Sequence, residues 1–154
     1  TAPDGHPANT LGSNSEWARS EMAIEVNTPE QVSAGIKELK EAGVDFLKFT
    51  YQGGDYWYFD NKLTIQKIDK ELMKQIIREG KENGLNSTAH VFYYDDVKEL
   101  LEAGIYGIEH GILDRDIETV KSDFDKYISS TGFSYKLCCR KSRGPLYRGA
   151  GGVS

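Results

Sequence analysis

The chain has 154 residues, of which 38% are hydrophobic, and its formal net charge is -5 at pH 7. This length and apolar content allow one domain with a core of ordinary size. Acidic and basic residues are interleaved through most of the chain, so neither an extended cationic surface nor a nucleic-acid partner is expected. No apolar run approaches the roughly 18 residues of a membrane-spanning helix. We therefore expect a soluble chain without a membrane partner.

The cysteines and the first residues leave the cellular compartment open. Cys138 and Cys139 are adjacent, a spacing that suits neither a disulfide framework nor a CxxC-type zinc site. The sequence starts at Thr1 without an initiator Met, in the turn-rich stretch 2–7, so an upstream targeting segment could have been lost. The localisation is left unknown.

The first clearly predicted helix begins after Thr28. Thr28 as the cap, Pro29 at the first helical position and Gln31 three residues after the cap form a capping box. Apolar residues follow at helical spacing, and Gly43 provides the left-handed residue that ends a helix. Residues 44–51 are rich in β-formers and apolar on both sides, which is typical of a buried strand in a parallel sheet.

The same order of helix, glycine and strand recurs three more times. The second helix has an apolar stripe at Leu72, Met73, Ile76 and Ile77. This helix starts at Asp69 and ends at Gly84, and residues 85–92 form the strand that follows it. The third unit starts at Asp95 or Asp96, ends its helix at Gly104 and has its strand at 105–110. A weaker fourth copy has a helix with Ile117, Val120, Phe124 and Ile128, Gly132 as its end and a strand at 133–138. Four such units in series predict an α/β fold with parallel strands joined by helical crossovers.

Two segments depart from this repeat. Residues 53–61 are an insertion rich in aromatic residues, predicted to be a long loop at a strand end, where such loops are usually functional. Residues 136–154 are basic, have no acidic residue and end in glycines, which predicts a disordered tail. A solvated terminus or a sequence artefact such as a shifted reading frame is favoured over a nucleic-acid arm. The domain is expected to span residues 1–135.

A polar residue able to bind a metal lies near the carboxyl end of each of the first three predicted strands: Lys48, His90 and His110. Barrels and open α/β sheets both place their active sites at these strand ends. Because the neighbours of Lys48 are apolar, we expect it to be buried and to need a counter-charge, a neutral form or chemical modification. Two neutral imidazoles and an anionic oxygen suit zinc or a similar divalent metal. Taken singly, the lysine could extend to water and either histidine could be a satisfied core residue.

Three motifs occur between helices that end in Glu-Ala-Gly or Glu-Asn-Gly: FLKF at residues 46–49, TAHV at 88–91 and GIEHG at 107–111. As a set they resemble the amidohydrolase superfamily, and most closely its branch of imidazolonepropionase-like and Xaa-Pro dipeptidase-like enzymes. The resemblance covers about residues 1–135. It implies a TIM-type (β/α)8 barrel, of which this chain would be an internal, partial piece containing about strands four to seven.

The resemblance also implies how the site is built. Lys48 would be carboxylated and bridge two metals, and His90 and His110 would bind one of them. The family's first-strand His-x-His and eighth-strand Asp have no counterpart here, and its Pro-Thr-Leu ending of strand seven is replaced by residues 136–139. One site for zinc or a similar metal is therefore expected in this chain, against two metals in a complete relative. The isolated chain is expected to be inactive.

Five further residues are candidates for substrate contacts: His6, Trp57, Tyr58, Tyr93 and Tyr94. His6 lies in a turn that resembles the family's Gly-Gly-His turn, although an exposed loop histidine is the favoured interpretation. Trp57 and Tyr58 could close over a ligand, with ordinary packing slightly favoured. Tyr93 and Tyr94 could border a pocket or cover the barrel rim.

The parent function that the resemblance implies is metal-dependent hydrolysis of C–N bonds in a small amide, cyclic amide or dipeptide. The alternative is a catalytically silent α/β piece that associates through its open sheet edges, for example as a homo-oligomer, since unpaired strand edges are strong association sites.

Overall fold

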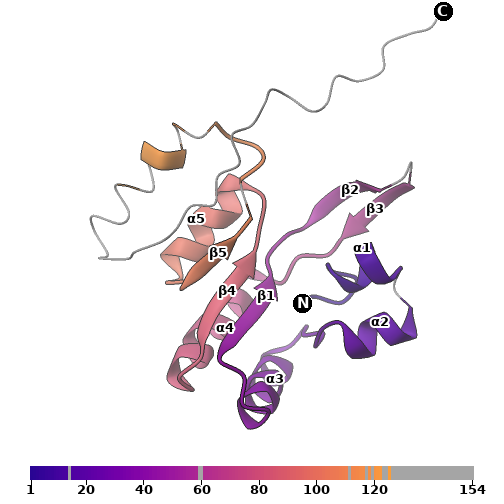
Figure 1. Ribbon diagram of the computed structural model, residues 1–154, viewed down its shortest axis with the longest axis vertical. Coiled ribbons are helices and arrows are strands. Elements are labelled where there is room, and N and C mark those ends of the chain that lie inside the picture. The colour runs from indigo at the N-terminus through magenta and orange to yellow at the C-terminus, as the bar shows by residue number, and fades with distance from the viewer. Residues whose placement is uncertain are drawn as a thin grey trace, which may run out of the picture.

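The computed structural model describes residues 1–13, 15–58, 61–110, 112–116, 118, 120–122 and 125, without the side chains of residues 56–58 and 61. Three helices are followed by three strands, and from α4 on helices and strands alternate (Figure 1). The helices are α1 (Ala8–Gly12), α2 (Glu16–Glu21), α3 (Pro29–Glu41), α4 (Lys70–Glu82) and α5 (Tyr94–Glu102), and the strands are β1 (Phe46–Thr50), β2 (Gly54–Tyr58), β3 (Asn61–Ile65), β4 (Asn86–His90) and β5 (Gly107–Glu109). None of these helices has the length and hydropathy that a bilayer crossing requires.

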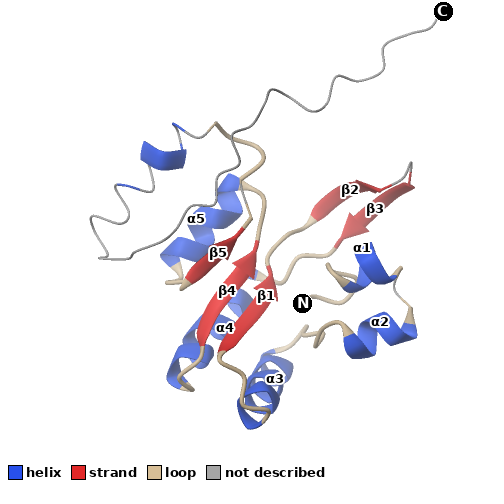
Figure 2. Ribbon diagram, in the orientation of Figure 1, coloured by secondary structure: helices blue, strands red, loops and turns tan. Residues whose placement is uncertain are grey.

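A three-stranded parallel sheet, in the order β1-β4-β5, is the centre of the fold (Figure 2). Its register brings Thr50, His90 and Glu109 level at the carboxyl ends of the three strands. The helices α4 and α5 provide the crossovers that parallel neighbours require. The predicted α/β class, a partial barrel with parallel strands, is confirmed for three of the four predicted units. The fourth unit falls outside the described residues apart from helical positions at 118, 120–122 and 125, and the predicted tail lies outside them altogether.

The capping box predicted at the start of α3 is present. The Thr28 hydroxyl accepts a hydrogen bond from the Gln31 backbone N–H at 3.3 Å, and the Gln31 side-chain oxygen accepts one from the Thr28 N–H at 3.1 Å. Both bonds satisfy backbone donors that the first turn of a helix leaves free.

Replacing Thr28 by Ala is therefore expected to lower the free energy of unfolding by about 1 kcal/mol, because the cap accepts a bond that water replaces only in part. Chemical denaturation checks this value. Thr28→Ser retains the hydroxyl and is the control. An equal loss in both variants would mean that the threonine methyl group, rather than the cap, matters.

The ends of the other units follow the predicted pattern. The Asp69 carboxylate caps α4 by accepting from the Glu71 N–H at 2.8 Å. Gly43, Gly84 and Gly104, which follow α3, α4 and α5, have φ angles of 75°, 75° and 82°. These glycines end their helices because a side chain is disfavoured at positive φ.

The start of α5 differs from the prediction. The helix begins at Tyr94 rather than after Asp95 or Asp96, and the residue before it provides no side-chain cap. Instead the Asp114 carboxylate accepts from the Tyr94 N–H at 2.9 Å. Asp95 and Asp96 lie in the first turn, where a carboxylate interacts favourably with the positive end of the helix dipole. The cap comes from 20 residues downstream, which no local pattern could indicate.

The prediction of a loop for the aromatic insertion at residues 53–61 is wrong. It forms most of an antiparallel hairpin, in which β2 and β3 pair from Gly54 with Ile65 to Tyr58 with Asn61. Residues 59–60 at its tip lie outside the described residues. Tyrosine and tryptophan favour extended backbone, so the same composition that suggested a functional loop is compatible with a hairpin.

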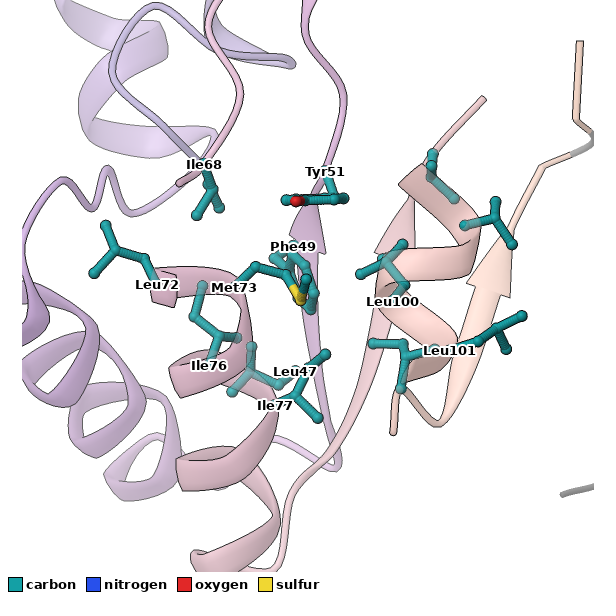
Figure 3. Packing of buried hydrophobic residues seen from close by; sticks show 14 of the residues in the cluster. Leu47, Phe49, Tyr51, Ile68, Leu72, Met73, Ile76, Ile77, Leu100 and Leu101 are labelled. Carbon is teal, nitrogen blue, oxygen red and sulfur yellow. The ribbon is translucent and has the colours of Figure 1, made fainter. Parts of the chain in front are cut away.

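The core lies between the sheet and the helices α4 and α5 (Figure 3). It includes the predicted stripe of α4, Leu47 and Phe49 of β1, and Tyr51 just after that strand. The expectation that β1 is buried on both faces is wrong: Phe46 is 51% exposed and the Lys48 side chain 57%. The helices cover one face of the sheet, and no described element buries these two residues on the other.

Candidate functional site

The three histidines of the chain meet at the carboxyl ends of the parallel strands. His90 is the last residue of β4 and is buried, whereas His110 follows β5 with a φ of 75° and is exposed. The His90 ring lies 4.3 Å from the His6 ring and 4.5 Å from the His110 ring, measured between centroids. The structure thus brings together the two predicted strand-end histidines and the histidine of the N-terminal turn.

The N-terminal turn is tied to the rest of the fold by hydrogen bonds. The Asn9 amide donates to the Asp4 carbonyl at 3.0 Å and to the Thr64 carbonyl of β3 at 3.1 Å. The His6 Nδ1 lies 2.5 Å from the Thr10 hydroxyl, and the His6 ring stacks on His90 with 21° between the planes. The favoured expectation of an exposed loop histidine is therefore wrong, since His6 is half-buried.

Gln52 fixes the orientation of the His90 ring. The His90 Nε2 lies 2.6 Å from the Gln52 side-chain oxygen, and both residues are buried. Because an amide oxygen only accepts, Nε2 carries the hydrogen and Nδ1 keeps its lone pair. Gln52 was not predicted as a site residue, since a glutamine just after a strand has no distinguishing pattern.

Both His90 and His6 favour the neutral form. Burial lowers the pKa of His90 to about 4, with further lowering by the charges of His6, His110 and Lys48 that Glu109 offsets only in part. Burial also lowers the pKa of His6, followed by the charges of His110 and Lys48. Neutral imidazoles have the lone pair that a metal ion requires.

Lys48 is paired with a carboxylate that the sequence analysis did not single out. The Lys48 Nζ lies 2.5 Å from Glu109 Oε2, and the other carboxylate oxygen accepts from the Thr88 hydroxyl at 2.9 Å. The predicted counter-charge is thus present, but Lys48 is exposed rather than buried. Burial raises the pKa of Glu109, but the hydrogen bonds from Lys48 and Thr88 and the nearby positive charges outweigh it, so the pKa is lowered.

The aromatic candidates Tyr93 and Tyr94 differ in burial. Tyr94 is buried at the start of α5 in the hydrophobic core, with the Lys98 ammonium 4.9 Å from its ring centroid. Tyr93 is half-buried just before it. Phe92, which the sequence analysis did not select, has its ring 4.7 Å from His90 and 5.4 Å from His110.

Trp57 and Tyr58, the remaining aromatic candidates, lie on β2 of the hairpin, and their side chains are outside the described part of the structure.

The imidazole nitrogens at this site are donors that suit a divalent transition metal, but their side chains are not arranged around a common point. Within the described part of the chain, no three His, Cys, Asp or Glu side chains are grouped closely enough to hold an ion. The imidazoles of His6 and His90 contact each other by their faces, and Lys48 is engaged with Glu109. The residues therefore fit a metal by their chemistry, and side-chain rotation would be needed to bind it.

No family model and no curated protein sequence matches the chain. Solved structures do. A Xaa-Pro dipeptidase with methionine bound in its active site aligns over 86% of this chain, with a TM-score of 0.58 and 22% identity. An uncharacterized protein aligns over 73%, with a TM-score of 0.54 and 21% identity. The fold shared with these structures is a partial, barrel-like α/β fold.

The third similar structure, phenylurea hydrolase B, aligns over 71% of this chain with a TM-score of 0.52 and 15% identity. The alignments cover only 31%, 26% and 25% of the three proteins, so this chain corresponds to less than a third of their length. At these identities the likeness shows the fold alone, and the activity of this partial barrel is a matter for proposal.

Proposed function

We propose that this partial barrel carries part of the active site of a metal-dependent hydrolase of C–N bonds. The observation that supports this most is the convergence of His6, His90 and His110 at the strand ends, where barrels keep their catalytic residues. The hydrolase names of two similar structures point to the same class of reaction.

His90 and His110 would hold zinc or a similar divalent metal, as their resemblance to the family's ligands implies. Lys48 would join them once carboxylated. When bound, such a metal polarises a carbonyl oxygen and lowers the pKa of water. Gln52 keeps a lone pair available on His90 by accepting from its other ring nitrogen.

The substrate class is a small amide, a cyclic amide or a dipeptide. Phe92 provides an apolar surface beside the His90 and His110 rings, against which the hydrocarbon part of such a molecule could pack. Tyr93 follows Phe92 directly and is half-buried. Tyr94 is buried in the core beneath the rim, so we assign substrate contact to Tyr93 rather than to Tyr94.

Zinc content and hydrolysis, measured on the same purified chain, test this proposal. After exposure to zinc and desalting, the chain should keep about one zinc, because it supplies ligands for a single site. Dipeptide and cyclic-amide hydrolysis should be no faster than with free zinc, because the family's Asp, the group for proton transfer, has no counterpart in this sequence. Turnover that disappears in His110→Ala would show instead that the chain has a complete site.

A second candidate function is association through the sheet edges, favoured by the position of β1 and β5 as the outer strands of the described sheet. Light scattering distinguishes the two. A folded oligomer that retains no zinc supports the silent α/β piece, whereas a zinc-containing chain supports the hydrolase-derived site.

A further inference from the structure

We propose that Asn83, at the end of α4, is a site of spontaneous deamidation, and that opening of the last turn of this helix controls its rate. Asn83 is the only asparagine of the sequence that is followed by glycine. The next residue matters because its backbone nitrogen attacks the asparagine side chain, and glycine has no side chain that blocks this approach. The inference is independent of the proposed hydrolase function.

The reaction needs only water as a co-reactant. The Gly84 backbone nitrogen loses its proton and attacks the carbonyl carbon of the Asn83 side chain. A new bond forms between these two atoms, the bond from this carbon to the side-chain nitrogen breaks, and the nitrogen leaves with the proton as ammonia. Water then opens the cyclic succinimide at either of its carbonyl groups, which gives aspartate or isoaspartate.

In the folded chain both reacting groups are engaged in hydrogen bonds. The Asn83 side-chain amide donates to the Glu79 carbonyl at 2.8 Å, and the Gly84 backbone N–H donates to the Lys81 carbonyl at 3.0 Å. Asn83 and Gly84 are both exposed, so packing does not protect them from water. Attack therefore requires these two hydrogen bonds to break, which is an opening of the last turn of α4.

This opening is local and does not require the whole chain to unfold. Helix ends fray more readily than core elements open. The chain is next fixed to the core at Leu85, which is 2% exposed and whose N–H donates to the Gly80 carbonyl at 2.8 Å. Asn83 and Gly84 lie between this anchor and the body of the helix, so they can separate from their partners while Leu85 stays in place.

The product would weaken the junction between α4 and β4. An aspartate at position 83 cannot donate to the Glu79 carbonyl, and a carboxylate at the end of a helix interacts unfavourably with the helix dipole. Isoaspartate also lengthens the backbone by one carbon just before β4. Because β4 is the central strand of the described sheet and ends at His90, the modification would affect the strand that carries this histidine.

Incubation of the full chain in mildly alkaline buffer, with and without denaturing guanidinium chloride, tests the proposal. Peptide mapping by chromatography and mass spectrometry measures aspartate and isoaspartate at each asparagine. Asn83 should be the first asparagine to react. Its reaction should be at least about tenfold slower in the folded chain, because the rate follows the population of the opened turn. Asn83→Gln is the matched control and should form no product at this position on the same timescale.

Guanidinium chloride below the unfolding transition then tests the role of the helix end. Hydrogen exchange of the Gly84 amide reports the opening, and it should rise in parallel with the rate of deamidation. Equal rates in the folded and unfolded chain, or a rate that does not follow this exchange, would show that opening of α4 does not control the reaction. Earlier reaction at another asparagine of the unfolded chain would show that Asn83 is not the preferred site.

Discussion

Replacing Leu100 by Ala is expected to lower the free energy of unfolding by about 2 to 5 kcal/mol, the usual range for a leucine removed from a core. Leu100 is fully buried on the side of α5 that faces Phe49 of β1 and Tyr51 just after that strand (Figure 3). The alanine would leave a cavity at the junction of helix and sheet, which the surrounding side chains can fill only in part. Urea denaturation measures the change.

Leu113→Ala is the matched control, because it makes the same chemical change at a side chain that is 71% exposed. It should alter the free energy of unfolding by less than about 0.5 kcal/mol. Equal effects of the two substitutions would show that the junction between α5 and the sheet is not the core of the folded chain.

Acid should destabilise the metal-free chain through His90. The pKa of this residue is about 4 in the folded chain against an ordinary value of 6.5, so the unfolded chain takes up the proton first as the pH falls. The contribution of neutral His90 to the free energy of unfolding is fully present above pH 6.5 and is lost progressively between pH 6.5 and pH 4. At about 1.4 kcal/mol per pH unit, the loss reaches about 3 kcal/mol.

Denaturation in the presence of a chelator, repeated between pH 7 and pH 4, measures this dependence. His90→Gln removes the titrating group, so its stability should fall less steeply over the same range. A smaller slope should persist in the variant, because burial also lowers the pKa of His6. An unchanged slope in His90→Gln would mean that His90 is not buried as a neutral imidazole.

Much of the fold could be predicted because its signals are local. The capping box at Thr28, the cap at Asp69 and the glycines that end α3, α4 and α5 each depend on residues within one helical turn. Apolar residues at helical spacing then identified the buried side of α4. Repetition of these signals was sufficient to predict parallel strands with helical crossovers.

The features that escaped prediction depend on contacts between distant residues. Asp114 caps a helix that begins 20 residues before it. The exposure of Lys48 depends on which elements cover the sheet, since the strand itself has the apolar pattern of a buried one. A sequence pattern reports the periodicity of one element and contains no information on whether a second element lies over it.

The candidate site was likewise predicted where its signals are local and missed where they depend on distant contacts. His90 and His110 were found because equivalent positions in repeated units fall near the carboxyl ends of neighbouring strands. The register pairs His90 with Glu109 and Lys48 with Thr88, so the three predicted ligands do not lie at one level. The contact of His6 with His90 spans more than 80 residues, and the Gln52 and Glu109 partners appear only when the strands are side by side. These partners decide which donors are available to a metal.

A crystal structure of the chain grown with zinc, with anomalous diffraction recorded at the zinc absorption edge, tests the central claim most directly. The strand-end site predicts an anomalous peak at zinc–nitrogen distance, about 2.0–2.1 Å, from both His90 and His110. A fully ordered sheet without a zinc peak at these two residues, or with zinc bound only elsewhere on the surface, would contradict the claim that this partial barrel carries a metal site.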